Sequence, residues 1–253
     1  MTKIEGSSIL VTGGGTGIGA GTARYLAQRG AKITICGRRK HKIEEVASSI
    51  GSNCQAIEGD ITVAEDRESI VEAAVTHGDG LDALVNNAGN MYRLPLESIA
   101  EEGLLDIFHS NVIAPMMLSS LCIPYLTDSE GSIVFLGSIH NRRAFPGVSP
   151  YAATKAAIES LTRSFAAELG QKSIRVNCVS PGAVFTEINQ RSGESTDSEA
   201  LARLEEIVKL NALTRIGEAE EIAQAIAYFI EAPWTTGTIL DVDGGLGLGL
   251  TRS

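Results

Sequence analysis

The feature that most limits the fold of this chain is a repeated alternation of short apolar runs with longer helical patterns. The runs are rich in β-branched residues and almost continuously apolar, as strands are when helices cover both faces of a sheet. They are Ser8–Thr12, Lys32–Cys36, Cys54–Glu58, Ala83–Asn86, Ser132–Gly137, Arg175–Ser180 and Ile239–Val242. The helical patterns are Gly17–Arg29, His41–Ile50, Glu65–Thr76, Glu101–Tyr125, Tyr151–Leu169 and Ala219–Phe229. The alternation predicts an α/β fold, a Rossmann-type doubly wound parallel sheet of seven strands flanked by helices.

Composition is consistent with a single domain over residues 1–253 and excludes several function classes. Hydrophobic residues make up 43% of the chain and charged residues 21%, which is enough apolar material for a substantial core. The formal net charge of −10 argues against a nucleic-acid partner, which needs a basic face. We see no signal peptide and no apolar run of membrane-spanning length, so we expect no membrane association.

The cysteines and histidines are dispersed along the chain. The four cysteines form no CxxC pair, so we expect neither disulfides nor a zinc site. We expect a reducing, cytoplasmic location instead. The four histidines are equally scattered, which gives a metal site little support.

One polar, acidic segment interrupts the alternation between the last two strands. It runs over Thr186–Glu206. Because ligands of such sheets bind beyond the carboxyl ends of the strands, an insertion there is a candidate substrate lid over about residues 186–210. The alternative is a surface excursion without a role.

A glycine-rich turn follows the first predicted strand. Gly13, Gly17 and Gly19 stand between that strand and the first helix, in the order G-x-x-x-G-x-G. A pyrophosphate can approach the backbone and the free N–H groups of the helix only where side chains are absent. A glycine cluster also occurs in ordinary tight turns, but its position between a strand and a helix favours a phosphate site.

The end of the second predicted strand bears on the choice of cofactor. A carboxylate at this place usually binds the adenosine ribose of NAD, but here Gly37 is followed by Arg38 and Arg39. A guanidinium suits a 2′-phosphate, so we expect NADP(H), with Arg38 as the main contact and NAD(H) as the alternative. The opposing interpretation is that the two arginines only solvate the strand end.

A tyrosine and a lysine share one face near the start of a predicted helix. Tyr151 and Lys155 are four residues apart, and Ser149 and Pro150 before them suggest a cap and a first-turn proline. A neighbouring ammonium stabilises a phenolate, so Lys155 is expected to lower the pKa of Tyr151 and make it a general acid and base. Ser138, at the end of the fifth predicted strand, offers a hydroxyl to hold a substrate oxygen.

These pieces together resemble the short-chain dehydrogenase/reductase family in its single-domain branch, over nearly the whole chain. The motifs that carry the resemblance are "TGGGTGIG" (12–19), "GDI" (59–61), "NNAG" (86–89), "HSN" ending at Asn111, Ser138, "YAATK" (151–155), "PGAVFT" (181–186) and "DVDGG" (241–245).

The resemblance implies a role for each residue of the catalytic set. Tyr151 would exchange the proton with the substrate oxygen, and Ser138 would orient that oxygen. Lys155 would tune Tyr151 and bind the nicotinamide ribose, while Asn111 would hold a water that links Lys155 to solvent. The implied cofactor-binding residues are Gly13, Thr16, Gly17, Ile18, Gly19, Arg38, Arg39, Asp60, Ile61, Asn87, Tyr151, Lys155, Val184 and Thr186.

Two positions depart from the family pattern. Gly137 stands where many members have a serine, and Thr16 stands where many NADPH-preferring members have a basic residue. One of the two usual basic positions is therefore missing. The resemblance also implies a homo-oligomer, a tetramer or a dimer, paired through the long helices.

The substrate is the least constrained part of the interpretation. Arg142 and Arg143 near Ser138 fit either an acidic or polar substrate or, as we favour, a subunit surface. His140 fits either a substrate contact or a buried structural residue. We expect an NADPH-dependent reductase of a small or medium apolar ketone, or the reverse alcohol oxidation. The alternatives are a carrier-linked 3-oxoacyl-thioester reductase, an NAD-dependent alcohol dehydrogenase and a non-catalytic dinucleotide-binding regulator.

Overall fold

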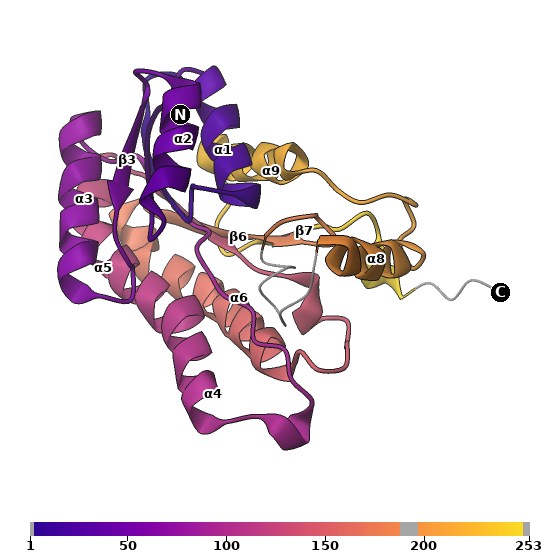
Figure 1. Ribbon diagram of the computed structural model, residues 1–253. Coiled ribbons are helices and arrows are strands. Elements are labelled where there is room, and N and C mark those ends of the chain that lie inside the picture. The colour runs from indigo at the N-terminus through magenta and orange to yellow at the C-terminus, as the bar shows by residue number, and fades with distance from the viewer. Residues whose placement is uncertain (1–2, 188–196, 250–253) are drawn as a thin grey trace.

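A seven-stranded parallel sheet forms the centre of the computed structural model, which describes residues 3–187 and 197–249 (Figure 1). The strand order is β3-β2-β1-β4-β5-β6-β7. The strands are β1 (Ser8–Thr12), β2 (Lys32–Gly37), β3 (Cys54–Glu58), β4 (Ala83–Asn86), β5 (Ser132–Leu136), β6 (Arg175–Pro181) and β7 (Ile239–Val242). The predicted Rossmann-type fold is confirmed. The order reverses between β1 and β4, which places a ligand crevice at their carboxyl ends.

Helices cover both faces of this sheet (Figure 1). They are α1 (Gly17–Gln28), α2 (Lys40–Ile50), α3 (Ala64–Gly78), α4 (Glu101–Phe108), α5 (Ala114–Asp128), α6 (Ser149–Leu169), α8 (Asp197–Val208) and α9 (Ala219–Glu231). Because side chains alternate along β1, Ile9 and Val11 pack in the core shared with α1, α2 and α9, whereas Leu10 packs with α3, α5 and α6. Two apolar layers therefore fix the sheet and the crevice at its edge.

The predicted helix Glu101–Tyr125 is interrupted by a wider turn. Between α4 and α5 the chain forms a π-helical turn, η2 (His109–Ile113), and this turn carries the buried Asn111. Such turns insert one residue per turn into a helix and are frequent at functional sites. Asn111 thus lies in a wide turn, where the backbone departs from α-helical geometry.

The same helical run corrects the expectation that no apolar stretch reaches membrane-spanning length. Glu101–Asp128 contains an 18-residue window with a mean hydropathy of 1.3, which is enough by length and composition to cross a membrane. Half of that window is buried, and α5 packs against β4 and α3. We interpret the run as a core helix of the fold.

The start of α6 differs from the prediction by two residues. Ser149 is the first residue of the helix rather than its cap, and Val148 is the N-cap, without a side-chain hydrogen bond. Pro150 does lie in the first turn, where its missing N–H has no cost. Part of the expected lid, 188–196, lies outside the described residues, and its remainder contains α8, which was not predicted.

Candidate active site

A cavity of about 490 Å³ opens at the carboxyl ends of the strands. Most of the predicted site residues line it. They are Gly13, Thr16, Gly17, Ile18, Arg38, Arg39, Asp60, Ile61, Asn87, Ser138, Tyr151, Lys155, Val184 and Thr186. Gly19 and Asn111 stand behind its wall. The topology thus brings residues from nearly the whole chain to one place.

The glycine-rich turn is tightly packed between β1 and α1. Gly13 and Gly17 have φ values of 65° and 53°, a region that side chains disfavour. A Cβ on Gly19 would lie 2.3 Å from the carbonyl oxygen of Gly13. This close packing leaves the N-terminus of α1 open toward the cavity, as a pyrophosphate requires.

The amide of Asn87 fastens the loop after β4 to the same turn. Its Nδ2 donates to the carbonyl oxygens of Thr12, at 2.8 Å, and Gly13, at 3.3 Å. The Thr12 hydroxyl in turn accepts the backbone N–H groups of Asn87 and Ala88. Asn87 therefore links β1 to β4, the two strands between which the strand order reverses.

Three cations and two carboxylates surround one end of the cavity. Arg38 lies 3.6 Å from Asp60, and Arg39 lies 2.7 Å from Glu187. Lys42 of α2 also lines the cavity and was not predicted, since helix-face lysines usually signal only solubility. This end carries one more positive than negative side chain.

Asp60 is held as a carboxylate by its own loop. Burial opposes its ionisation, but hydrogen bonds from the backbone and hydroxyl of Thr62, together with Arg38, outweigh burial and hold the pKa below its ordinary value. Through its hydrogen bonds with Thr62, the Asp60 side chain therefore holds the loop after β3 in place.

Tyr151, Lys155 and Ser138 meet at the opposite end of the cavity. Both α6 residues are buried, and Lys155 Nζ donates to the carbonyl oxygen of Leu136 at 2.8 Å. The same nitrogen lies 5.6 Å from the ring centroid of Tyr151. Ser138 follows β5 directly, so the end of a strand and the first turn of a helix present the three groups together.

The pKa of Tyr151 differs from the expectation. Burial raises this pKa to about 12, against the opposing effect of a hydrogen bond with Ser138, whereas the sequence predicted that Lys155 would lower it. Burial also lowers the pKa of Lys155 to about 8. Desolvation of the phenolate outweighs the attraction of an ammonium that is directed at Leu136. The phenol is thus protonated at neutral pH.

Asn111 closes the inner wall of the site. Its Oδ1 accepts the Asn90 N–H at 2.7 Å, and its Nδ2 donates to the Asn90 carbonyl at 2.8 Å and to the Thr154 hydroxyl at 3.1 Å. A Cβ on Gly89 would lie 3.1 Å from Asn111 Oδ1 and 3.9 Å from Lys155 Nζ. The missing side chain of Gly89 therefore leaves the space between Asn111 and Lys155 clear.

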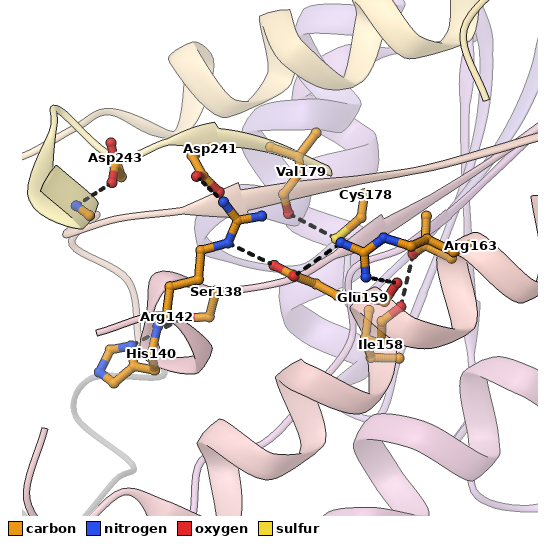
Figure 2. Close-up of polar contacts among 12 residues, drawn as sticks. Ser138, His140, Arg142, Ile158, Glu159, Arg163, Cys178, Val179, Asp241 and Asp243 are labelled. Carbon is orange, nitrogen blue, oxygen red and sulfur yellow. Dashed lines mark hydrogen bonds and ion pairs between the residues drawn. The ribbon is translucent and has the colours of Figure 1, made fainter. Parts of the chain in front are cut away.

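The two arginines after Ser138 are bound within their own chain. Figure 2 shows Arg142 between Asp241 of β7 and Glu159 of α6, with atom separations of 2.6 and 3.5 Å. Arg143 donates to the carbonyl oxygen of Leu246 at 2.7 Å. Both anchor the segment after Ser138, a role that the sequence did not indicate.

Comparison with known proteins identifies the family to which this chain belongs. The sequence profile described as Enoyl-(Acyl carrier protein) reductase matches residues 13–247. L-fucose dehydrogenase of Bos taurus is 32% identical over 259 residues, covering 99% of this chain and 93% of that protein. The chain belongs to the short-chain dehydrogenase/reductase family.

Other members of the family extend the comparison. Carbonyl reductase family member 4 of Danio rerio is 34% identical over 241 residues, covering 94% of this chain and 97% of that protein. A solved structure of 3-ketoacyl-(acyl-carrier-protein) reductase from Brucella melitensis complexed with NADH is 29% identical, with a TM-score of 0.88, covering 96% of this chain and 99% of that one.

As a family member, the protein is an NAD(P)-dependent oxidoreductase that acts on small molecules. The cavity fits such a cofactor: its glycine turn excludes side chains where a pyrophosphate binds, and one end carries cations. The individual roles of the lining residues stay predictions.

Proposed function

We propose that the protein is an NADPH-dependent oxidoreductase that reduces a ketone, or oxidises the corresponding secondary alcohol, with Tyr151 as the general acid and base. The observation that carries this proposal is the meeting of Ser138, Tyr151 and Lys155 at one end of a cavity whose other end is a phosphate cradle. The cofactor would supply the hydride, and the protein the proton and the orientation.

The ionisation of the site fits the proton transfer that ketone reduction requires. A buried phenol with a pKa of about 12 is protonated at neutral pH, which is the form that donates a proton to the carbonyl oxygen. The Ser138 hydroxyl holds the same oxygen, so the developing negative charge meets two O–H donors. Lys155, with its pKa of about 8, is protonated for most of the neutral range and favours proton release from Tyr151.

The preference for NADPH over NADH rests on Arg38. Gly37 supplies no carboxylate at the end of β2, and Arg38 lies on the cavity wall with a separation of 3.6 Å from Asp60. A charge-assisted contact with a 2′-phosphate would give about a 10- to 100-fold preference. Asp60 competes for the same guanidinium, so the lower part of that range is expected.

The experiment is a comparison of NADPH and NADH consumption over small ketones, ketoacids and β-keto thioesters, followed by nicotinamide absorbance. Arg38→Met is expected to lower the NADPH/NADH ratio of kcat/KM about tenfold or more. Lys40→Met removes the same charge at a neighbouring residue that does not line the cavity, and it should keep the ratio. An equal ratio in wild type and Arg38→Met would exclude the Arg38 contact.

A second candidate is reduction of a carrier-linked 3-oxoacyl thioester. The similarity to the 3-ketoacyl reductase of Brucella melitensis favours it. Turnover with β-keto thioesters and not with free ketones would select this candidate. Cofactor binding without turnover on any class would instead favour a non-catalytic dinucleotide-binding regulator.

We also propose that the protein is cytoplasmic and forms a homo-oligomer. Four large apolar side chains are exposed along α4, η2 and α5: Leu105, Ile113, Met117 and Tyr125. A second copy of the chain would cover such a face, which is typical of self-association. Light scattering that gives a monomer at micromolar concentration would exclude the oligomer.

A further inference from the structure

Lys42 lies on the cavity wall where the glycine turn and the end of β2 approach each other. A Cβ on Gly15 and a Cβ on Gly37 would each lie 3.2 Å from Ile43 Cγ2, so Ile43 fills the space between the two segments. The Cβ on Gly15 would also lie 3.2 Å from Lys42 Cβ. Lys42 is half-buried and lines the cavity together with Arg38. Its side chain therefore starts beside the glycine turn and borders the space that a cofactor fills.

The place of Lys42 in α2 is unfavourable for the helix alone. Lys42 stands in the first turn, where a positive charge meets the positive end of the helix dipole. The turn contains no acidic residue to offset this charge, and the N-cap residue Arg39 makes no side-chain hydrogen bond to the free N–H groups. Helix stability thus gives no reason for a cation at this position, whereas a bound anion does.

Carboxylates of the protein already face the other two cations at this end of the cavity. Arg39 lies 2.7 Å from Glu187, and Arg38 lies 3.6 Å from Asp60. Among residues 3–187 and 197–249, by contrast, no carboxylate forms an ion pair with Lys42. The excess positive charge of this end therefore resides on Lys42.

This excess charge is matched to one particular phosphate of a dinucleotide. The pyrophosphate belongs at the N-terminus of α1, and the adenosine ribose belongs at the end of β2, beside Gly37. Lys42 shares the ribose end with Arg38, because α2 follows β2 after only two residues. NADPH carries a 2′-phosphate on this ribose and NADH does not, so a cation here distinguishes the two cofactors.

We propose that Lys42 is a specificity-determining residue, whose ammonium binds the 2′-phosphate of NADPH together with Arg38. Arg39 stays with Glu187 and contributes less to the preference. The inference rests on the proposed use of NADPH and deepens it, because it adds a second cation that comes from a helix rather than from the end of the strand.

Binding without turnover tests the contact. Adenosine 2′,5′-bisphosphate and adenosine 5′-monophosphate differ only in the 2′-phosphate, and calorimetry on the whole protein gives the Kd of each. Lys42→Met is expected to weaken the binding of the bisphosphate about tenfold, while the Kd of the monophosphate stays unchanged. Tenfold is the lower end of the range for a charge-assisted contact, because Lys42 is only half-buried. Fluorescence titration of NADPH and NADH should show the same change in the ratio of their Kd values.

Three further variants separate the charge of Lys42 from its packing. Lys42→Arg keeps a cation and should retain most of the discrimination. Lys40→Met removes a charge from an exposed residue that does not line the cavity, so it should behave as wild type. Thr16 lines the cavity next to Gly15 and makes no cap hydrogen bond, so it can be replaced at little structural cost. Adding Thr16→Lys to Lys42→Met should restore part of the discrimination.

The outcomes distinguish the inference from the proposed function. Equal weakening of bisphosphate and monophosphate in Lys42→Met would assign Lys42 to the pyrophosphate and overturn the inference. Unchanged binding of both, or a Lys42→Arg variant as weak as Lys42→Met, would overturn it as well. In these cases a lowered preference in Arg38→Met would leave the proposed use of NADPH standing. If wild type binds NADPH no better than NADH and Arg38→Met changes nothing, that use itself fails, and the inference fails with it.

Discussion

Arg39 Nη2 lies 2.7 Å from Glu187 Oε2, and this ion pair joins the start of α2 to the loop after β6 across the cavity that both residues line. Nearby, a Cβ on Gly17 would lie 3.0 Å from Thr186 Cβ, so the same loop also covers the glycine turn. The predicted contact of Arg39 with a 2′-phosphate must therefore compete with a carboxylate of the protein.

Glu187→Gln is expected to tighten the binding of NADPH relative to NADH. The change releases Arg39 for the 2′-phosphate and removes one negative charge from that end of the cavity. An exposed ion pair is worth about 0.2–1 kcal/mol, so the ratio of the two Kd values should shift about 1.4- to fivefold in favour of NADPH. Fluorescence titration measures the Kd values of NADPH and NADH. Glu206→Gln is the control, because it breaks an exposed ion pair between Glu206 of α8 and Lys209, which follows that helix. Equal shifts for both cofactors would contradict the competition.

Tyr151→Phe is expected to abolish turnover while cofactor binding persists. Phenylalanine keeps the ring that packs at the edge of His140 but has no proton to transfer. Loss of a general acid typically costs about 10²- to 10⁴-fold in kcat. Single-turnover absorbance measures the rate, and fluorescence measures the Kd of NADPH. A rate within tenfold of wild type would show that another group supplies the proton.

The buried Lys155 should make stability depend on pH. Burial lowers its pKa from the ordinary 10.5 to about 8, so between these values the unfolded chain binds a proton that the folded protein does not. Stability from this position therefore rises with pH through that window and is lost as pH falls to 8. Urea unfolding of wild type and Lys155→Met should show wild type gaining about 2 kcal/mol relative to the variant between pH 7.5 and 10. A constant difference would indicate an ordinary lysine pKa.

Gly19→Ala should damage the fold of the glycine turn. The added Cβ would meet the carbonyl oxygen of Gly13 at 2.3 Å, and backbone atoms cannot move aside cheaply. Overpacking of this kind costs about 1–3 kcal/mol, and NADPH binding should weaken with it. Gly170→Ala is the matched control because no atom lies within 4 Å of its added Cβ and its φ is −57°. Thermal unfolding of the two variants should separate them clearly, and equal melting temperatures would contradict the packing argument.

The strands, though not their order in the sheet, followed from the sequence because strands that are covered on both faces are almost continuously apolar. Every predicted strand is present, with ends that agree to within one residue. The runs are apolar on both faces, so neither the face nor the register had to be inferred. Most of the cavity residues were implied by the resemblance to the short-chain dehydrogenase/reductase family, and they lie together because the strand ends of a parallel sheet meet at one edge.

Features that depend on tertiary contacts did not follow. The π turn at Asn111 has the same apolar pattern as the α-helices around it, so periodicity could not separate the three segments. The raised pKa of Tyr151 depends on the burial of its side chain, and the anchoring of Arg142 depends on Glu159 and Asp241, which lie 17 and 99 positions away in sequence. Sequence spacing indicates neither burial nor such distant partners.

The π turn at Asn111 also restricts how the chain can change in length. A residue advances an α-helix by about 100° around its axis, and the wide turn of η2 takes up one extra residue without changing the phase between α4 and α5. Deletion of one residue there would close the turn into α-helix and leave the later side chains of α5 on their present faces, while Asn111 would lose the turn that presents its amide. Core packing therefore tolerates a change in length at this place that the presentation of Asn111 does not.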